Sequence, residues 1–493
     1  MTTTLPLYTA EQVRELDRTA IEEAGIPGYT LMSRAGAAAW DALRGDWPEA
    51  RRIVVVCGTG NNGGDGYVLA RLALQANCRV TVLQAGEAAR IGGDALTARD
   101  AYLAAGGEVH AGDLAGLPDA GVIVDALFGT GLDRALEGEW LAMVEAVNRA
   151  AVPVLAIDIP SGLHADSGAV LGVAVKAHRT VTFIGRKQGL YTGQAAEFTG
   201  QITFSDLGVP ADTYRRLAAS AQLLTAPPLG VLAAPRPRAA HKGANGHVLV
   251  IGGDHGMNGA LRLAGEAALR TGAGLVSLAT RSGHAAAISA ACPELMSHGV
   301  ESAGDLRRLL ARATVVAIGP GLGRSRWAQG LLAAVLESSL PLVVDADALN
   351  LLGCEPLRRE DWVLTPHPGE AGRLLKQKTA MVQENRYTAV RALAETYGGV
   401  AVLKGAGTLV THAGAPVAVC AAGNPGMAAG GMGDVLSGVI AGLIAQGLEP
   451  PQASMAGVCL HALAGDRAAV NGERGMTARD VISELRAVMN AGA

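Results

Sequence analysis

The fold of this chain is decided by one stretch, Asn424-Pro425-Gly426-Met427-Ala428-Ala429-Gly430-Gly431-Met432-Gly433-Asp434-Val435-Leu436-Ser437. The apolar run from Val435 to Ile444 predicts a buried helix that begins directly after the glycine-rich loop. Free backbone N–H groups at the start of such a helix can bind an anion. Asp434 would repel that anion, which favours a role in which it accepts a proton from a hydroxyl while a phosphoryl group arrives. The alternative is a carboxylate that only stabilises the helix N-terminus.

Length and composition indicate a cytoplasmic protein of two to four domains. The chain has 493 residues, of which 49% are apolar, so it can bury more than one core. Its 41 basic and 45 acidic residues give no electrostatic reason to expect a nucleic acid or a membrane surface as partner. The six cysteines lack metal-site spacing and favour reduced thiols. No apolar run reaches about 18 residues, so we expect no membrane span. The N-terminus is polar and has no basic stretch followed by an apolar one, so we expect no signal segment.

A glycine-rich loop also follows the first predicted strand. The strand covers residues 52–57, and the loop covers residues 58–66. Three glycines of the loop fit the dinucleotide pattern G-x-G-x-x-G, but the next strand ends in Gln84 and not in an acidic residue. The loop also contains two asparagines and an aspartate, which a pyrophosphate site does not need. We therefore interpret it as a polar ligand site with a cation, and not as a site for a resident NAD.

Polar side chains follow three strands of this first half. They are Asn61, Asn62, Asp65, Asp125, Asp158 and Ser161. Strands alternate with helices, which predicts a parallel α/β sheet whose carboxyl ends meet at one edge. Each aspartate alone is more often a turn residue, but the convergence of three strand ends favours a site. Oxygen donors without Cys or His suit an alkali or alkaline-earth ion and not zinc.

A connector rich in proline and arginine, residues 225–238, marks the best domain boundary. We predict domains at residues 1–223 and 224–493, both of α/β class. In the second domain Lys404 ends a strand and is followed by glycines. This order differs from a Walker A loop, yet such backbone can approach a phosphate while the lysine adds charge.

Three further residues of the second half leave alternatives open. His367 stands between two prolines and is equally a ligand contact or a structural residue. Asp345 and Asp347 end a strand. They would hold a magnesium-bound nucleotide or a substrate hydroxyl, or they would form an Asx turn.

These motifs, in this order, resemble the family of bifunctional NAD(P)H-hydrate repair enzymes over nearly the whole chain. The most specific matches are residues 58–66, 124–131, 365–370 and 424–437. The resemblance implies an N-terminal Rossmann-like three-layer α/β/α domain that acts as an NAD(P)H-hydrate epimerase. It also implies a C-terminal ribokinase-like α/β/α domain that acts as an ADP-dependent (S)-NAD(P)H-hydrate dehydratase.

In the epimerase half, the resemblance implies a substrate site beside a potassium ion. The implied substrate contacts are Asn61, Asn62, Gly63, Gly64, Asp65, Gly129, Thr130, Gly131, Leu132, Asp133, Arg134, Ala135 and Asp158. The implied potassium ligands are Asn62, Asp125 and Ser161. Asp158, or Asp125 acting with the cation, is the implied group that moves a proton.

In the dehydratase half, the resemblance implies adjoining hydrate and nucleotide sites. The implied hydrate contacts are Ala260, Gly321, His367 and Asp434, and the implied nucleotide contacts are Lys404, Gly405, Ala406, Gly407, Thr408 and Gly433. The implied nucleotide is ADP bound with Mg²⁺, and ATP stays open as the donor. The expected partners are small molecules, namely NADH hydrate, NADPH hydrate and ADP. We expect a homo-oligomer that binds neither nucleic acid nor membrane.

The implied chemistry agrees with the interpretation of Asp434 from the residues. Hydroxide is a poor leaving group, so phosphoryl transfer to the hydroxyl of the hydrate lets phosphate leave instead. The glycines before Asp434 would stabilise the charge of the phosphoryl group during transfer. Two alternatives stay open: a small-molecule kinase of thiazole or sugar type with a nucleotide-binding N-terminal domain, and a first domain that is a non-catalytic module.

Overall fold

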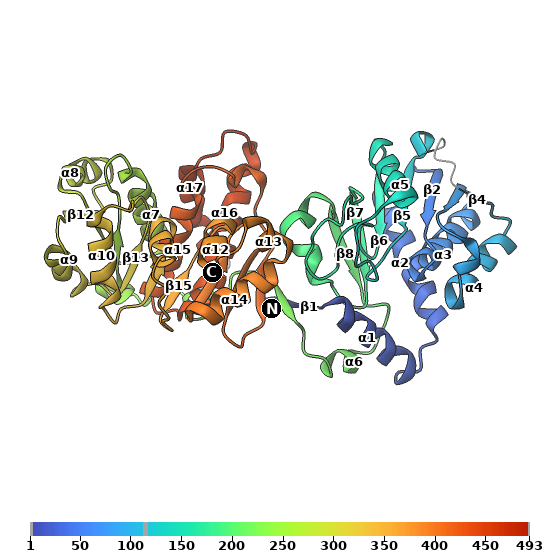
Figure 1. The fold of residues 1–493 in the computed structure, drawn as a ribbon, viewed down its shortest axis with the longest axis horizontal. Coiled ribbons are helices and arrows are strands. Elements are labelled where there is room, and N and C mark those ends of the chain that lie inside the picture. Colours follow the sequence, from blue (N-terminus) through green and yellow to red (C-terminus); the bar gives the residue numbers. More distant parts are fainter. Residues whose placement is uncertain (1–2, 112–116, 492–493) are drawn as a thin grey trace. The chain divides into compact units, whose positions relative to one another are not determined.

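The computed structural model describes residues 3–111 and 117–491, so the outer domain limits at residues 1 and 493 lie outside it (Figure 1). The chain forms two compact units, Pro6–Ala221 and the chain from Gln222 onward together with the segment that ends at Leu5. This division lies two residues before the boundary predicted between 223 and 224. The sequence also gave no sign that strand β1 (Thr4–Leu7) is the neighbour of β9 (Ala221–Leu224) in the sheet of the second unit.

The first unit is built on a seven-stranded sheet with the order β4-β3-β2-β5-β6-β7-β8. Every neighbouring pair in it is parallel, as the alternation of strands and helices predicts. The strands are β2 (Arg52–Cys57), β3 (Arg79–Gln84), β4 (Val109–Ala111), β5 (Val122–Ala126), β6 (Val154–Ile157), β7 (Arg179–Phe183) and β8 (Gln201–Ser205). The carboxyl ends of β2, β5, β6 and β7 therefore meet at one edge.

Helices cover both faces of this sheet. They are α1 (Ala10–Glu22), α2 (Gly28–Asp46), α3 (Asn61–Gln75), α4 (Gly93–Ala104), α5 (Gly138–Arg149) and the short α6 (Ala211–Arg215). Val55 of β2 packs in one core with α1 to α4, whereas its neighbour Val54 packs in another core with α5. Successive strand residues point to opposite faces, so the three-layer α/β/α arrangement follows.

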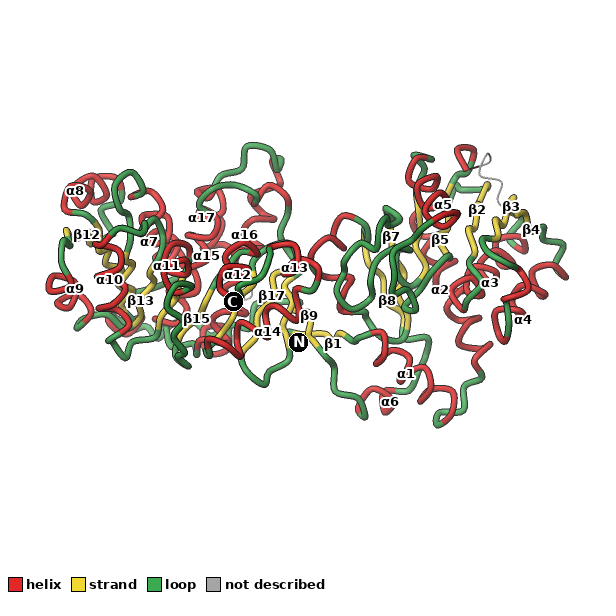
Figure 2. The backbone as a smooth tube through the Cα atoms, viewed as in Figure 1, coloured by secondary structure: helices red, strands yellow, loops and turns green. Residues whose placement is uncertain are grey.

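The second unit holds the larger sheet, with the order β1-β9-β18-β17-β16-β15-β14-β13-β10-β11-β12. Its strands are β10 (His247–Ile251), β11 (Leu275–Thr280), β12 (Met296–Gly299), β13 (Val315–Ile318), β14 (Leu342–Val344), β15 (Trp362–Leu364), β16 (Val400–Leu403), β17 (Thr408–His412) and β18 (Val417–Cys420). The strands from β12 to β16 along this order pair in parallel, and β17 and β18 are antiparallel additions. Figure 2 shows strands lying among helices in this unit.

The helices of the second unit are α7 (Asn258–Thr271), α8 (Ser282–Ala291), α9 (Ala303–Leu310), α10 (Arg326–Leu336), α11 (Ala346–Leu352), α12 (Pro368–Leu374), α13 (Thr379–Glu384), α14 (Arg386–Tyr397), α15 (Met432–Ala445), α16 (Pro450–Ala468) and α17 (Ala478–Met489). Helix α15 is buried from Val435 to Ile444, which confirms the buried helix predicted there. It lies so close to α7 that a Cβ on Gly438 would stand 2.0 Å from the carbonyl oxygen of Ala264. Within the described ranges, the helices are all too short or too polar to cross a bilayer.

Candidate active sites

Asp434 lies in the first turn of α15, as the sequence predicts. The N-cap residue, Gly431, has a φ of 89°, a left-handed conformation that favours glycine. Burial and the nearby carboxylate of Asp345 raise the pKa of Asp434 to about 7, while Lys404 opposes this shift. A carboxyl group in this position can exchange a proton near neutral pH.

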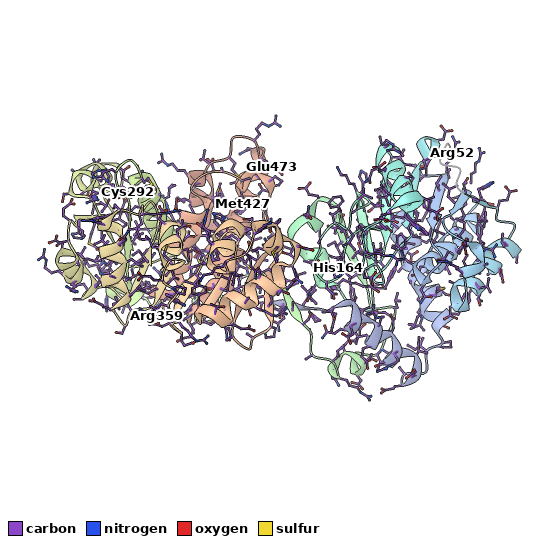
Figure 3. The ribbon with its side chains drawn as sticks, in the orientation of Figure 1. Arg52, His164, Cys292, Arg359, Met427 and Glu473 are labelled. Atoms are coloured by element: carbon purple, nitrogen blue, oxygen red, sulfur yellow. The ribbon has the colours of Figure 1, made fainter. Side chains whose placement is uncertain are left out.

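The loop that precedes α15 is held by hydrogen bonds and by close packing of its backbone. Asn424 accepts a hydrogen bond from the N–H of Gly426 at 3.0 Å and donates to Asp466 at 3.0 Å. A Cβ on Gly426 would lie 2.7 Å from the carbonyl oxygen of Glu473, and Figure 3 labels Glu473 together with Met427 of this loop. These contacts hold the loop in place before the chain enters α15.

An ion pair joins three elements beside Asp434. Lys404 Nζ, at the end of β16, lies 2.7 Å from Oδ1 of Asp345, at the end of β14. The second oxygen, Oδ2, accepts a hydrogen bond of 2.7 Å from Ser437 of α15. Asp345 is 1% exposed, and Lys404 holds the pKa of its carboxyl below the usual range despite burial.

The structure shows the protein partners of Asp345 and Asp347. Both oxygens of Asp345 accept hydrogen bonds, one from Lys404 and one from Ser437, so its charge is already paired within the protein. Asp347 accepts a hydrogen bond of 3.0 Å from the N–H of Gly323 and lies 3.7 Å from Arg324. The sequence placed both residues correctly at a strand end, but spacing alone does not reveal the partner that a carboxylate takes.

The two predicted nucleotide segments lie together. A Cβ on Gly433 would stand 3.1 Å from Lys404 Nζ and 3.4 Å from Asp345 Oδ2. In the segment from Lys404 to Thr408, Gly405 and Gly407 have φ angles of 127° and 60°. Because Gly405, Gly407 and Gly433 have no Cβ atom, a ligand can approach the backbone of both segments near Lys404.

Two buried side chains beside these segments were missed by the sequence reasoning. Arg386 is 1% exposed and donates at 3.2 Å to the carbonyl oxygens of Leu403 and Lys404, where it supports the start of the loop. His461 of α16 has a buried Nε2 without a partner among the described residues, and burial lowers its pKa to about 4. Neither residue has a motif around it that would have marked it.

His367 has a definite structural role. It is the N-cap of α12, its Nδ1 accepts a hydrogen bond of 3.0 Å from the N–H of Gly369, and Pro368 occupies the first helical turn. The carboxylate of Glu370 accepts from the N–H of His367 at 2.9 Å and lies 3.4 Å from its Nε2. About half of the ring stays exposed, so this role leaves the side chain open to a ligand.

The remaining predicted hydrate contacts are neighbours in the fold. Gly321 follows β13 and has a φ of 59°, and Ala260 lies in the first turn of α7. A Cβ on Gly321 would lie 3.3 Å from the Cβ of Ala260 and 2.5 Å from the carbonyl oxygen of Met257. The space at this strand end therefore depends on glycine.

The polar loop of the first unit differs from the prediction in one respect. Residues Asn61 to Asp65 form the first turn of α3 and not an extended loop, because α3 already begins at Asn61. Asn62 is 7% exposed, and neither its amide oxygen nor its amide nitrogen has a hydrogen-bond partner in the described part of the chain. Burial of both amide groups without a partner is costly, which indicates that a ligand completes the site.

Asp125 and Ser161 are joined directly. Oδ1 of Asp125 accepts from Ser161 Oγ at 2.6 Å, and Oδ2 accepts from the N–H of Ser161 at 2.8 Å. Ser161 Oγ in turn accepts from the N–H of Phe128 at 2.9 Å. Asp125 is fully buried, and this burial raises its pKa to about 6, against the opposing effect of the hydrogen bonds from Ser161.

The donors of this group fit an alkali ion. The side chains predicted to bind it offer one carboxylate, one amide and one hydroxyl, all through oxygen. Among the residues that the structure describes, no cluster of three or more His, Cys, Asp or Glu is arranged to hold a metal. The unpartnered oxygen of Asn62 is the observation that favours a cation here.

Asp158 lies at the end of β6 and faces the substrate segment predicted at residues 129–135. Its φ is 67°, which is uncommon for a residue with a side chain. A Cβ on Gly129 would lie 3.3 Å from Asp158 Oδ2 and 3.6 Å from Cγ of Asn62, so the structure brings these three together. Of the other residues in that segment, Thr130 and Leu132 are half-buried, and Gly131, Asp133, Arg134 and Ala135 are exposed.

A buried lysine beside Asp158 was also missed. The ammonium of Lys187 contacts Oδ1 of Asp158 and is 1% exposed. The chain contains only six lysines, and Lys187 has a glycine two residues away on each side. Glycine neighbours were one signal that marked Lys404, and that signal applies equally to Lys187.

Two families match the chain, one for each unit. Residues 28–189 match the family described as YjeF-related protein N-terminus, and residues 248–487 match the family described as NAD(P)H-hydrate dehydratase. The bifunctional NAD(P)H-hydrate repair enzyme Nnr of Coxiella burnetii is 51% identical over 98% of this chain and 99% of its own length. The Nnr of Escherichia coli is 44% identical over 98% of this chain and 94% of its own length.

A solved structure supports the fold of the second unit. A ribokinase-like superfamily protein of Enterococcus faecalis is 31% identical and has a TM-score of 0.51, with 55% of this chain and 96% of that protein covered. The ribokinase-like prediction is therefore confirmed, and the alternative of a small-molecule kinase is not favoured. The chain belongs to the family of bifunctional NAD(P)H-hydrate repair enzymes, which join an NAD(P)H-hydrate epimerase domain to an NAD(P)H-hydrate dehydratase domain.

Proposed function

We propose that Asp434 is the catalytic base of the dehydratase. It takes the proton of the hydroxyl on the (S)-hydrate while the terminal phosphoryl group of ADP moves to the hydroxyl oxygen. AMP is released, the carbon–oxygen bond breaks, and phosphate leaves with the oxygen of the hydroxyl. A proton lost from the adjacent ring carbon restores the double bond of NADH or NADPH. The observation that carries this proposal is a carboxyl group with a pKa of about 7 at the start of a buried helix.

The nucleotide site is proposed at residues 404–408 and Gly433. The ammonium of Lys404 supplies positive charge, and glycine at position 433 lets the backbone come within reach of it. The donor is ADP, and Mg²⁺ arrives with its phosphates, while the carboxylate of Asp345 is paired with Lys404 and Ser437. When bound, this ion would neutralise phosphoryl charge. The hydrate lies against Ala260, Gly321 and the exposed part of His367.

The epimerase site is proposed at the strand ends of the first unit. Asn62, Asp125 and Ser161 would hold K⁺, which would offset the charge of a buried carboxylate. Residues 61–65, residues 129–135 and Asp158 would contact the hydrated nucleotide. Two observations support this site. The side-chain amide of Asn62 has no hydrogen-bond partner among the described residues. Asn62 and Oδ2 of Asp158 both lie close to Gly129. We further propose that the enzyme is a cytoplasmic homo-oligomer.

Oxygen transfer tests the proposed phosphoryl route. The (S)-hydrate of NADPH is prepared in ¹⁸O water, so that its hydroxyl carries the label, and is incubated with the enzyme, ADP and Mg²⁺ in ordinary water. We expect one labelled oxygen in the released phosphate, formed together with AMP. Unlabelled phosphate would exclude transfer to the hydroxyl, and the matched Asp434→Asn variant should release neither product.

A further inference from the structure

Lys187 is a buried cation that the proposed function does not use. Its ammonium contacts Oδ1 of Asp158, lies 3.1 Å from Thr182 Oγ1 and donates to the carbonyl oxygen of Phe183 at 2.9 Å. Both Thr182 and Phe183 belong to β7. The ammonium is therefore fixed by the end of one strand while it contacts the carboxylate that follows another.

The two oxygens of Asp158 have different surroundings. Oδ1 lies beside Lys187 and within 3.4 Å of the N–H of Phe183. Oδ2 faces the backbone of Gly129, where a Cβ would stand 3.3 Å away. The left-handed backbone at Asp158, with a φ of 67°, orients the side chain in this way. One oxygen is thus held by the protein and the other faces the proposed substrate segment.

Asp125, the other carboxylate considered for proton movement, is arranged differently. It is fully buried, and its two oxygens accept three hydrogen bonds, two from Ser161 and one from the N–H of Leu127. The side chain of Asp125 is 0% exposed, whereas that of Asp158 is 15% exposed. This contrast favours Asp158 as the residue that meets the substrate and leaves Asp125 to order the strand ends.

Two more carboxyl groups face the same ammonium. They are Asp17 of α1 and Asp65 of α3, and the charges of Asp158 and Lys187 act on both. Burial raises the pKa of Asp17 to about 6 and raises that of Asp65 well above its usual range. Among these three carboxyl groups, the ammonium of Lys187 forms its ion pair with Asp158.

We propose that Lys187 is the positioning residue of the epimerase site, holding Oδ1 of Asp158 so that Oδ2, as the catalytic carboxylate, faces the substrate. This inference rests on the proposed epimerase site and deepens it, because it chooses Asp158 over Asp125. A lysine in this place orients the carboxylate through a close ion pair.

The test follows epimerisation with the purified (R)-hydrate of NADPH, ADP and Mg²⁺. Only epimerised hydrate can be dehydrated, so the return of reduced-nicotinamide absorbance reports the first domain, while the (S)-hydrate reports the second domain on the same chain. Lys187→Met should lower kcat for epimerisation by about 10²-fold, the effect of a misplaced catalytic group, with little change in KM. Lys187→Arg should retain most of the rate, and Lys176→Met, at an exposed lysine of the same unit, should retain all of it.

The split between kcat and KM separates positioning from simple packing. A misplaced carboxylate should lower kcat in Lys187→Met with little change in KM, and Lys187→Arg should restore kcat, whereas a packing defect would raise KM as well. In case Lys187→Met fails to fold, the double variant Asp158→Asn/Lys187→Met removes both charges. It should fold, dehydrate the (S)-hydrate normally, and epimerise no faster than Asp158→Asn alone.

Each contrary result has a distinct meaning. A parent enzyme that does not convert the (R)-hydrate contradicts the proposed epimerase site itself. A parent that converts it, with Lys187→Met equally fast or with a raised KM and an unchanged kcat, overturns the role of Lys187. Normal epimerisation by Asp158→Asn would overturn the choice of Asp158.

Discussion

The ammonium of Lys404 lies 2.7 Å from Oδ1 of Asp345, and the position of a Cβ on Gly433 is within 3.4 Å of both groups. This ion pair joins the ends of β14 and β16 to the first turn of α15, where Asp434 lies. Burial and Asp345 raise the pKa of Asp434 to about 7, and the charge of Lys404, which is paired with Asp345, only partly opposes this shift. The arrangement places a carboxyl group with a raised pKa, Asp434, beside the proposed nucleotide site.

The dehydratase rate should depend on pH through Asp434. A base works only when ionised, and the pKa of this carboxyl is raised to about 7 by burial and by Asp345. The rate at saturating substrate should therefore rise with pH up to about 7 and level off above it. Asp434→Asn should lower the rate by about 10²–10⁴-fold above pH 7 and should remove this dependence on pH. A flat profile between pH 5 and pH 8 in the parent would contradict Asp434 as the base.

Gly433→Ala should impair the dehydratase because the new methyl group would stand 3.1 Å from Lys404 Nζ. We expect a higher KM for ADP and a lower kcat. The control is Gly330→Ala, on the exposed side of α10, where a Cβ meets nothing within 4 Å. This control should keep full activity and gain about 0.5–1 kcal/mol in stability from the helix propensity of alanine. Equal kinetics for the two variants would show that close backbone approach at Gly433 is unimportant.

Lys404→Met should destabilise the second domain as well as weaken ADP binding. Asp345, 1% exposed, would be left as an unpaired buried charge, which costs about 3–5 kcal/mol. The double variant Asp345→Asn/Lys404→Met should recover most of that stability in denaturant unfolding but not the ADP affinity. Because Lys404 lowers the pKa of Asp345, the pair stabilises the fold at neutral pH, and this contribution should fade as the pH falls below about 4.

The epimerase should require a monovalent cation of the size of K⁺. Replacing K⁺ by Li⁺ in the buffer should slow conversion of the (R)-hydrate without affecting dehydration of the (S)-hydrate. Asn62→Ala removes the amide that lacks a partner, so it should abolish the difference between the two ions. Epimerisation by the parent at the same rate in both salts would contradict the proposed ion site.

The sequence allowed prediction of the parallel sheets and of the strand ends that carry Asp125, Asp158 and Lys404. These follow from apolar runs that end in polar residues, a local pattern. It did not predict that β1 joins the second sheet, because pairing with β9 depends on residues more than two hundred positions away. The capping role of His367 was left open, since it requires the side chain of Glu370 in a particular rotamer.

The partners of buried charges were the least predictable part of the sites. An aspartate such as Asp345 can bind a metal ion or a hydroxyl. Its two oxygens instead accept hydrogen bonds from Lys404 and Ser437, which belong to two other parts of the fold. Arg386 was missed for the same reason, since its role comes from tertiary contacts and not from a local motif. Lys187 had glycines nearby as a signal, but its partner Asp158 comes from a tertiary contact.

The most direct test of the whole account uses a mixture of both NADPH-hydrate epimers with ADP and Mg²⁺. The absorbance of reduced nicotinamide is followed to completion with the parent enzyme and with Asp434→Ala. We predict full recovery by the parent, because the first domain interconverts the epimers and the second drains the pool, and no recovery by the variant. Recovery that stops at the fraction of one epimer would contradict the epimerase assignment, and no recovery with either ADP or ATP would contradict the dehydratase assignment.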